Sequence, residues 1–162
     1  MRSHSAYMKI ALQEAWKAYE SGEIPVGALI VSDDGLMLAR AHNESIGRND
    51  PTAHAEVIAL RQAAETVGNY RLTHTSMYVT VEPCIMCAGA LIHARVKEVI
   101  FGAFDPKWGA LQSLYHLGHD ERLNHRLHVI SGVLEADCID LMKRFFRERR
   151  KGEEKQGILD SE

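Results

Sequence analysis

The sequence predicts an α/β fold in which a mixed five-stranded sheet is covered on both faces by helices. Five short apolar runs have the length of strands, and segments of helical periodicity separate most of them. Interleaving of this kind is typical of a layered α/β domain. The chain of 162 residues suits a single domain, which at this size buries about 70% of its unfolded surface without disulfides.

Apolar side chains at helical spacing predict the first helix, and a glycine follows where it can end. These residues are Met8, Leu12, Ala15, Trp16 and Tyr19, with Gly22 after them. Residues 26–31 and 37–41 are expected to form a hairpin, because the segment between them contains Asp33-Asp34-Gly35. Glycine tolerates the positive φ that such a turn needs.

The alternation continues through the rest of the chain. We expect a second helix over residues 53–66, and then a strand over residues 76–81 that leads into a helix opened by Pro83. Two further strands are expected at residues 99–103 and 127–130. With the hairpin, these strands complete the five of the predicted sheet.

Two short motifs supply the kinds of ligand that zinc prefers. His54 and Glu56 stand two residues apart, and Pro83 is followed by Cys84 and Cys87. Since the two cysteines lie one helical turn apart on the same face, both sulfurs can reach one ion. The positive end of the helix dipole also favours their thiolate form. His54 and Glu56 are about 200° apart around a helix, so we expect different roles for them.

A set of three ligands indicates catalysis, because a structural zinc site usually closes its tetrahedron with four protein ligands. Zinc with an open position lowers the pKa of a water to about 7, and Glu56 is the candidate base. Two alternatives stay open. Cys84 and Cys87 could form a redox pair, or another of the nine histidines could complete a structural site. Cys138 lies in an apolar helical pattern and is expected to pack as a small hydrophobe.

The residues around these motifs resemble the cytidine deaminase-like superfamily, and most closely its bacterial tRNA-specific adenosine deaminases. The resemblance rests on residues 50–56, which read DPTAHAE, and on residues 82–90, which read EPCIMCAGA. It extends over nearly the whole chain, from Pro25 to Arg147. The motif is specific for the superfamily and less specific for the base.

The resemblance implies a three-layer α/β/α sandwich with one Zn²⁺ per chain, held by His54, Cys84 and Cys87, and Glu56 as the group that moves protons. The implied reaction is hydrolytic deamination of the wobble adenosine of a tRNA anticodon to inosine. A deaminase of free cytosine, deoxycytidylate or guanine shares the metal motif and is the second interpretation. A noncatalytic RNA-binding module with a structural zinc is the third.

Three residues match positions that the resembled family uses for substrate: Asn43 for the base, and Asp105 and Lys107 for the RNA. An Asn after a strand and an Asp-Pro pair are also ordinary turn residues. The loop departs from the family, since a leucine and Gln112 stand where relatives usually carry a small residue and glycine, and Trp108 is bulky. Either change could reshape the loop or provide a stacking face for an unpaired base.

The net charge of −3 does not indicate nucleic-acid binding, so an RNA partner requires a local basic surface. Residues 143–151, the basic segment, hold six basic side chains in nine positions and continue a helical pattern. That pattern consists of Ile139, Leu141, Met142, Phe145 and Phe146. The cations could bind RNA phosphates, or they could simply stabilise the negative C-terminal end of a helix. The resemblance favours the first role, with a tRNA anticodon stem-loop as the partner. We expect no DNA partner, and the resemblance implies a homodimer.

The domain is expected to span residues 1–151, with residues 152–162 as a flexible tail, because those last residues mix acids, lysine and glycine without periodicity. Three cysteines, an odd number, argue against a secreted disulfide framework. The first ten residues lack an apolar signal core, and no run approaches the roughly 20 apolar residues of a membrane span. We therefore expect a cytoplasmic protein without a membrane partner.

Overall fold

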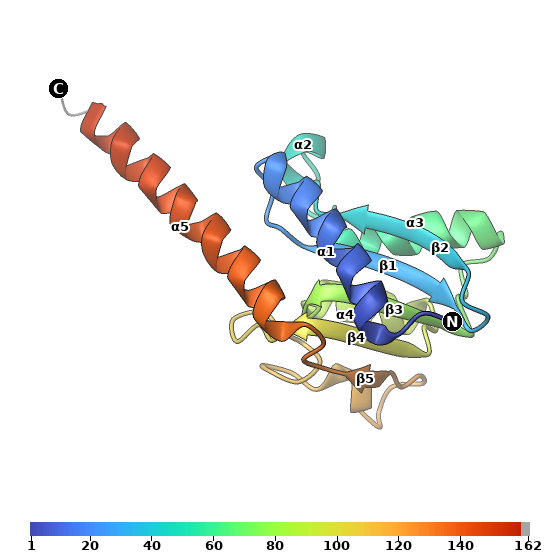
Figure 1. Ribbon diagram of the computed structural model, residues 1–162. Coiled ribbons are helices and arrows are strands. Elements are labelled where there is room, and N and C mark those ends of the chain that lie inside the picture. Colours follow the sequence, from blue (N-terminus) through green and yellow to red (C-terminus); the bar gives the residue numbers. More distant parts are fainter. Residues whose placement is uncertain (160–162) are drawn as a thin grey trace.

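A computed structural model describes residues 1–159 and shows five strands in one mixed sheet with helices on both faces (Figure 1). The strand order is β2-β1-β3-β4-β5. The strands are β1 (Gly27–Ser32), β2 (Met37–His42), β3 (Thr75–Val81), β4 (Glu98–Ala103) and β5 (His128–Ile130). β1 pairs antiparallel with β2 and β3, whereas β3, β4 and β5 are parallel. The predicted three-layer α/β/α sandwich is confirmed.

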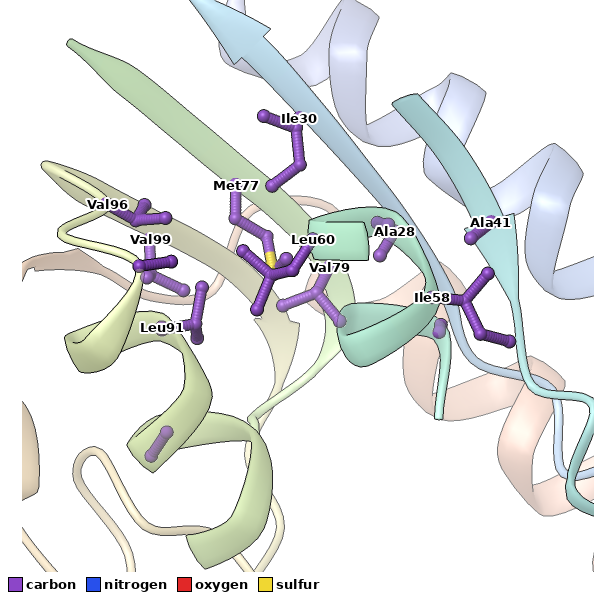
Figure 2. Close-up of a cluster of buried hydrophobic side chains, with 14 of the residues drawn as sticks. Ala28, Ile30, Ala41, Ile58, Leu60, Met77, Val79, Leu91, Val96 and Val99 are labelled. Atoms are coloured by element: carbon purple, nitrogen blue, oxygen red, sulfur yellow. The ribbon is translucent and has the colours of Figure 1, made fainter. Parts of the chain in front are cut away.

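Two buried clusters hold the helices against the sheet, one on each face. The helices are α1 (His4–Glu20), α2 (Ser45–Arg48), α3 (Ala55–Val67), α4 (Ile85–His93) and α5 (Glu135–Leu159), with a 3-10 turn, η1 (Leu117–His119). Ile30 and Val79 face α3 and α4, as Figure 2 shows, while their neighbours Leu29 and Tyr78 face α1 and α5. This alternation follows from the two-residue period of a strand.

Small residues allow the helices on the α1 face to lie very close to the sheet. A Cβ atom on Gly27 would lie 2.0 Å from the Ala11 carbonyl oxygen of α1. Likewise, a Cβ atom on Gly102 would lie 2.3 Å from the sulfur of Cys138. Cys138 is 1% exposed and free, so the prediction that it packs as a small hydrophobe is confirmed.

The helix ends differ in two places from the sequence prediction. The helix after β3 begins at Ile85 with Cys84 as its N-cap, so Pro83 precedes the helix instead of opening it. α5 continues through the basic segment to Leu159, so residues 152–159 are helical. The flexibility of this end stays a prediction, and residues 160–162 lie outside the described residues. In the described part of the chain, no helix combines the length and apolar character needed to cross a membrane.

Candidate metal centre

His54, Cys84 and Cys87 form the candidate metal centre, and the direction of the strands explains how they meet. β2 and β3 both run antiparallel to β1, so their C-terminal ends lie at the same end of the sheet. The chain leaves β2 and reaches His54, the N-cap of α3, and it leaves β3 and reaches Cys84, the N-cap of α4. Two helix N-termini therefore converge at one end of the sheet.

The three ligand atoms have the spacing of a zinc site. His54 Nδ1 lies 3.7 Å from Cys84 Sγ and 3.5 Å from Cys87 Sγ. A tetrahedral zinc with Zn–N near 2.05 Å and Zn–S near 2.3 Å would separate nitrogen from sulfur by about 3.6 Å. Within residues 1–159, no fourth His, Cys, Asp or Glu joins this group. The residues therefore fit a zinc ion that keeps an open position, and both cysteines are free thiols.

The hydrogen bonds within the centre stabilise one thiolate among its three candidate ligands. The hydrogen bond from Cys87, with a further one from His54, lowers the pKa of Cys84 to about 4 against the opposing effect of burial. The pKa of Cys87 is raised, because its thiol donates to Cys84 and is buried. The hydrogen bond with Cys84 raises the pKa of His54. A stable thiolate at Cys84 is one of the two negative charges that balance a divalent ion.

Glu56 lies beside the metal centre in the first turn of α3. It is 4% exposed, and burial raises its pKa to about 7, with the nearby His54 acting in the opposite direction. Cys87 is a hydrogen-bond partner of the Glu56 carboxylate, so the acid is close to a sulfur ligand. A carboxyl group with a pKa near neutrality can both accept and release a proton at the same pH, as a general acid and base must.

Asn43 lies at the end of β2 and caps α3. Its Oδ1 accepts a hydrogen bond of 2.8 Å from the Ala55 N–H, and its own N–H donates to the Val26 carbonyl at 3.1 Å. The side chain is 7% exposed and satisfies one of the N–H groups that a helix start leaves open. The structure thus brings Asn43 next to His54 and Glu56, which the sequence alone cannot show.

In the loop after β4, Asp105, one of the three residues matched to the family, stabilises a turn. Asp105 Oδ1 accepts hydrogen bonds from the N–H groups of Lys107 at 3.0 Å and Trp108 at 3.2 Å. Lys107 is exposed, and Trp108 is 66% exposed. Cys84 and Gly109 form a β-bridge, which places this loop directly against the α4 N-terminus. Contact of Asp105 and Lys107 with RNA stays a prediction.

Glu82 is a buried residue of this site to which the sequence analysis gave no role. It is 3% exposed and accepts hydrogen bonds from the N–H groups of Asp105, Leu111, Gln112 and Ser113, and from the Ser113 hydroxyl. These bonds lower the pKa of Glu82 although burial, the largest effect, raises it. The sequence does contain one signal for this role, because an acidic residue stands directly before Pro83 at the end of a buried strand.

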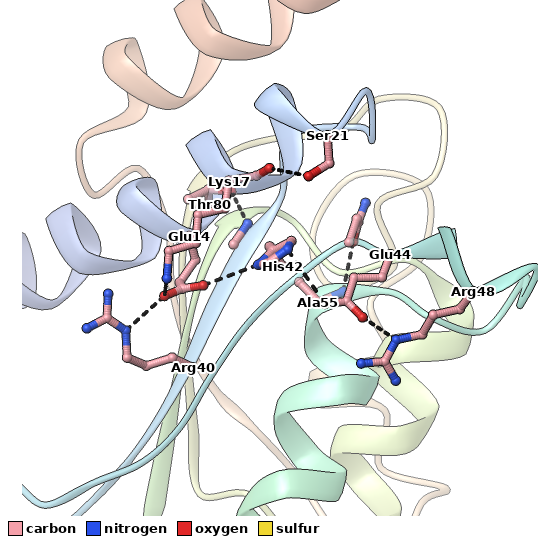
Figure 3. Close-up of polar contacts among 11 residues, drawn as sticks. Glu14, Lys17, Ser21, Arg40, His42, Glu44, Arg48, Ala55 and Thr80 are labelled. Carbon is pink, nitrogen blue, oxygen red and sulfur yellow. Dashed lines mark hydrogen bonds and ion pairs between the residues drawn. The ribbon is translucent and has the colours of Figure 1, made fainter. Parts of the chain in front are cut away.

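A second buried carboxylate fastens the end of β2 to α1. Glu14 is 3% exposed and accepts from Lys17 and Arg40 at 2.9 Å each and pairs with His42 at 3.3 Å (Figure 3). His42 directly precedes Asn43, so the network supports the residue that caps α3. Although burial raises the pKa of Glu14, these partners lower it overall.

Comparisons with known proteins agree with this geometry. The cytidine and deoxycytidylate deaminase zinc-binding region matches residues 1–103. The tRNA-specific adenosine deaminase of Haemophilus influenzae is 50% identical over 144 residues, covering 89% of this chain and 83% of the relative. That of Bacillus subtilis is 47% identical over 151 residues and covers 93% of each chain. A solved structure from a study of A-to-I editing by tRNA:A34 deaminases at the wobble position superimposes with a TM-score of 0.81 and 40% identity, covering 84% of this chain and 98% of that one.

Proposed function

We propose that this chain, which belongs to the cytidine and deoxycytidylate deaminase zinc-binding family, converts the wobble adenosine of a tRNA anticodon to inosine by hydrolysis. The observation that carries the proposal is the metal centre of one imidazole and two sulfurs beside the buried Glu56. The likeness to tRNA-specific adenosine deaminases over most of the chain supports adenosine as the base. An anticodon loop is already unpaired, so its base can enter a pocket at little cost.

The residues of the site have separate tasks in this reaction. A zinc ion held by His54, Cys84 and Cys87 would supply a water of lowered pKa as the nucleophile. Glu56 would take one proton of that water and give it to the ring nitrogen. It would then move the second proton, from the hydroxyl added to the ring carbon, to the departing amine, which leaves as ammonia. Burial keeps the Glu56 carboxyl away from bulk solvent, so its protons pass between the reacting atoms.

We also propose Asn43 as a contact to the base, and Asp105 and Lys107 as contacts to the RNA. The position of Asn43 between β2 and α3 supports its role, because its side chain lies at the same end of the sheet as the metal centre. The β-bridge between Gly109 and Cys84 supports the loop contacts, since it brings the loop to the same place. Substituting each residue with alanine and measuring KM for the anticodon RNA tests these roles.

The reaction is tested by incubating the zinc-loaded protein with an anticodon stem-loop and following the RNA by mass spectrometry. Deamination of adenosine raises the mass of one nucleotide by about 1 Da, and fragmentation locates it. Free adenosine, cytidine and guanine serve as parallel substrates. Inosine at the wobble position supports the proposal, whereas turnover of a free base or nucleoside with inert RNA contradicts it.

The basic segment is proposed to bind RNA phosphates. α5 leaves the domain at the end of the sheet that carries the metal centre (Figure 1). Its first half is fastened to α1, since Phe145 lies 5.9 Å from the Tyr19 ring and the Arg144 guanidinium lies 5.4 Å from the Trp16 ring centre. Within residues 1–159, Arg144 and Arg149 have carboxylate partners on the same helix. In the same range, no ion pair involves Arg147 or Arg150, so both can serve a polyanion.

We expect the double substitution Arg147→Ala and Arg150→Ala to lower the affinity for the anticodon RNA. The salt dependence of that affinity should become weaker as well. Each lost phosphate contact lowers the slope of log affinity against log salt by about 0.7 to 0.9. Fluorescence anisotropy at several salt concentrations measures both quantities. Lys97→Ala is the control, because Lys97 precedes β4 at the opposite end of the sheet. An unchanged slope in the double variant would exclude the basic segment from the RNA surface.

We propose further that the protein is a homodimer formed through the face of α3 and α4 that points away from the sheet. A shallow, largely apolar groove lies between these helices, lined by Val57, Leu60, Arg61, Ala64, Tyr70, Ala90, His93 and Ala94. Tyr70 is 68% exposed there, which suits burial by a second copy. Light scattering gives the mass, and a monomer at micromolar concentration would contradict the proposal.

We also propose a cytoplasmic location, which the free thiols of the metal centre support. Cell fractionation tests this location.

A further inference from the structure

The loop of residues 104–113 has exposed side chains outside and a buried anchor beneath. Phe104 is 41% exposed and Trp108 is 66% exposed, so the outer surface is available to a ligand. Beneath them, Glu82 Oε1 accepts from the Asp105 N–H at 3.2 Å. Glu82 Oε2 accepts from three consecutive N–H groups, at 3.1 Å from Leu111, 2.9 Å from Gln112 and 3.0 Å from Ser113. One carboxylate therefore holds both ends of the exposed segment.

The same anchor connects the loop to the α4 N-terminus. Glu82 is two residues before Cys84, and the Pro83 carbonyl between them accepts a hydrogen bond of 2.9 Å from the Ala110 N–H. Gly109 packs directly on the carboxylate, since a Cβ atom there would lie 2.4 Å from Glu82 Cδ. The side chain of Glu82 thus acts together with this backbone contact to hold the loop against the α4 N-terminus.

We propose that Glu82 is a positioning residue for RNA binding, which fixes the 104–113 loop in the conformation that contacts the nucleotides around the target adenosine. The inference rests on the proposed function for its substrate. Glu82 acts through the loop and touches neither the base nor the metal. Its loss is therefore expected to affect KM for RNA more than kcat, because His54 is the N-cap of α3 and Glu56 lies in the first turn of that helix, so both keep their places.

Glu82→Gln is the sharpest test, because glutamine keeps the shape of glutamate but offers one acceptor oxygen where the carboxylate offers two. The other terminal group becomes an NH₂ donor, which must face N–H groups of the loop. The β3 backbone is preserved, since the Glu82 N–H still donates to the Ala103 carbonyl. We expect KM for the anticodon stem-loop to rise about tenfold, the size of one charge-assisted hydrogen bond, with kcat changed less than about threefold.

Hydrogen exchange gives a readout that does not depend on the substrate. In the wild-type protein the amides of residues 111–113 are protected by Glu82, and the glutamine variant is expected to lose that protection while binding one zinc per chain. Val31→Ala is the matched control for general destabilisation. Val31 is buried on the α1 face and pairs with Ser76, at the far end of β3 from Glu82. It should lower the melting temperature and leave KM and loop protection unchanged.

Three results would overturn the inference: an unchanged KM with unchanged loop protection, loss of zinc from Glu82→Gln, or an equal rise of KM in Val31→Ala. If Glu82→Gln does not fold, Ser113→Ala removes only the hydroxyl donor, and KM should rise in the same direction by about twofold to threefold. An unchanged KM in that variant would then overturn the inference. If wild-type protein leaves the RNA unmodified, the proposed function fails, while the exchange experiment still tests the anchor.

Discussion

Glu56→Gln is expected to lower kcat for the anticodon RNA by about 10²–10⁴-fold, the usual contribution of a general acid and base. Glutamine has nearly the same volume, so the first turn of α3 should keep its packing although the residue is 4% exposed. It can neither take a proton from water nor deliver one to the leaving amine. Zinc content and RNA affinity should therefore stay within error of the wild-type values. Single-turnover kinetics, metal analysis and anisotropy measure the three quantities separately.

The matched control is Glu65→Gln, the same substitution on the same helix at an exposed position. It is expected to leave kcat unchanged. A Glu56→Gln variant with wild-type kcat would remove Glu56 from the mechanism, whereas absence of any deamination by the wild-type protein would favour a binding module. Loss of activity accompanied by loss of zinc would instead assign Glu56 a role in holding the metal.

The metal centre could be predicted from sequence because its chemistry is local. The spacing of Cys84 and Cys87 is defined within one helical turn, and Glu56 is two residues from His54. Their meeting in space requires only that the strands before them end on the same side of the sheet. The parallel direction of β2 and β3, each antiparallel to β1, provides this. The residues and the fold class therefore followed from short patterns and their order.

The anchors of the site could not be predicted, because hydrogen-bond partners far apart in sequence define them. Glu82 accepts from groups 23 to 31 residues later, in a segment without regular structure. Asn43 likewise has its partner at Ala55, across the turn that contains α2. A sequence identifies such residues as polar groups beside apolar strands. Only the folded loops determine which N–H groups surround them.

The length of α5 was underestimated for a different reason. The prediction followed apolar periodicity, which ends with Phe145 and Phe146, whereas the helix continues to Leu159 with exposed side chains from Phe146 onwards. Charge pairs one turn apart replace the apolar stripe, as Arg144 with Glu148 and Arg149 with Glu153 show. Such pairs add only a few tenths of a kcal/mol each, so periodicity alone gives no signal for them.

His54→Ala is expected to abolish activity by a different route, through loss of the metal. The variant keeps two sulfur ligands but loses one of the three donors, whose nitrogen lies 3.7 Å and 3.5 Å from those sulfurs. We expect zinc to fall from one per chain to a small fraction and deamination to become undetectable. A ligand that binds only the folded protein stabilises it by about 4 kcal/mol at 1,000 times its Kd, so the melting temperature should fall as well.

Chelation of the wild-type protein provides the complementary experiment, because it removes zinc without changing the chain. Its melting temperature should fall towards that of His54→Ala, and added zinc should restore activity to the wild-type protein but not to the variant. His128→Ala is the control, since that imidazole is 68% exposed on the edge strand β5 and should leave zinc content and activity unchanged. A His54→Ala protein that retains one zinc and wild-type activity would show that another donor completes the site. Two sulfurs alone do not provide the three protein ligands of a catalytic zinc site. In that case a residue other than His54 would have to be the third ligand.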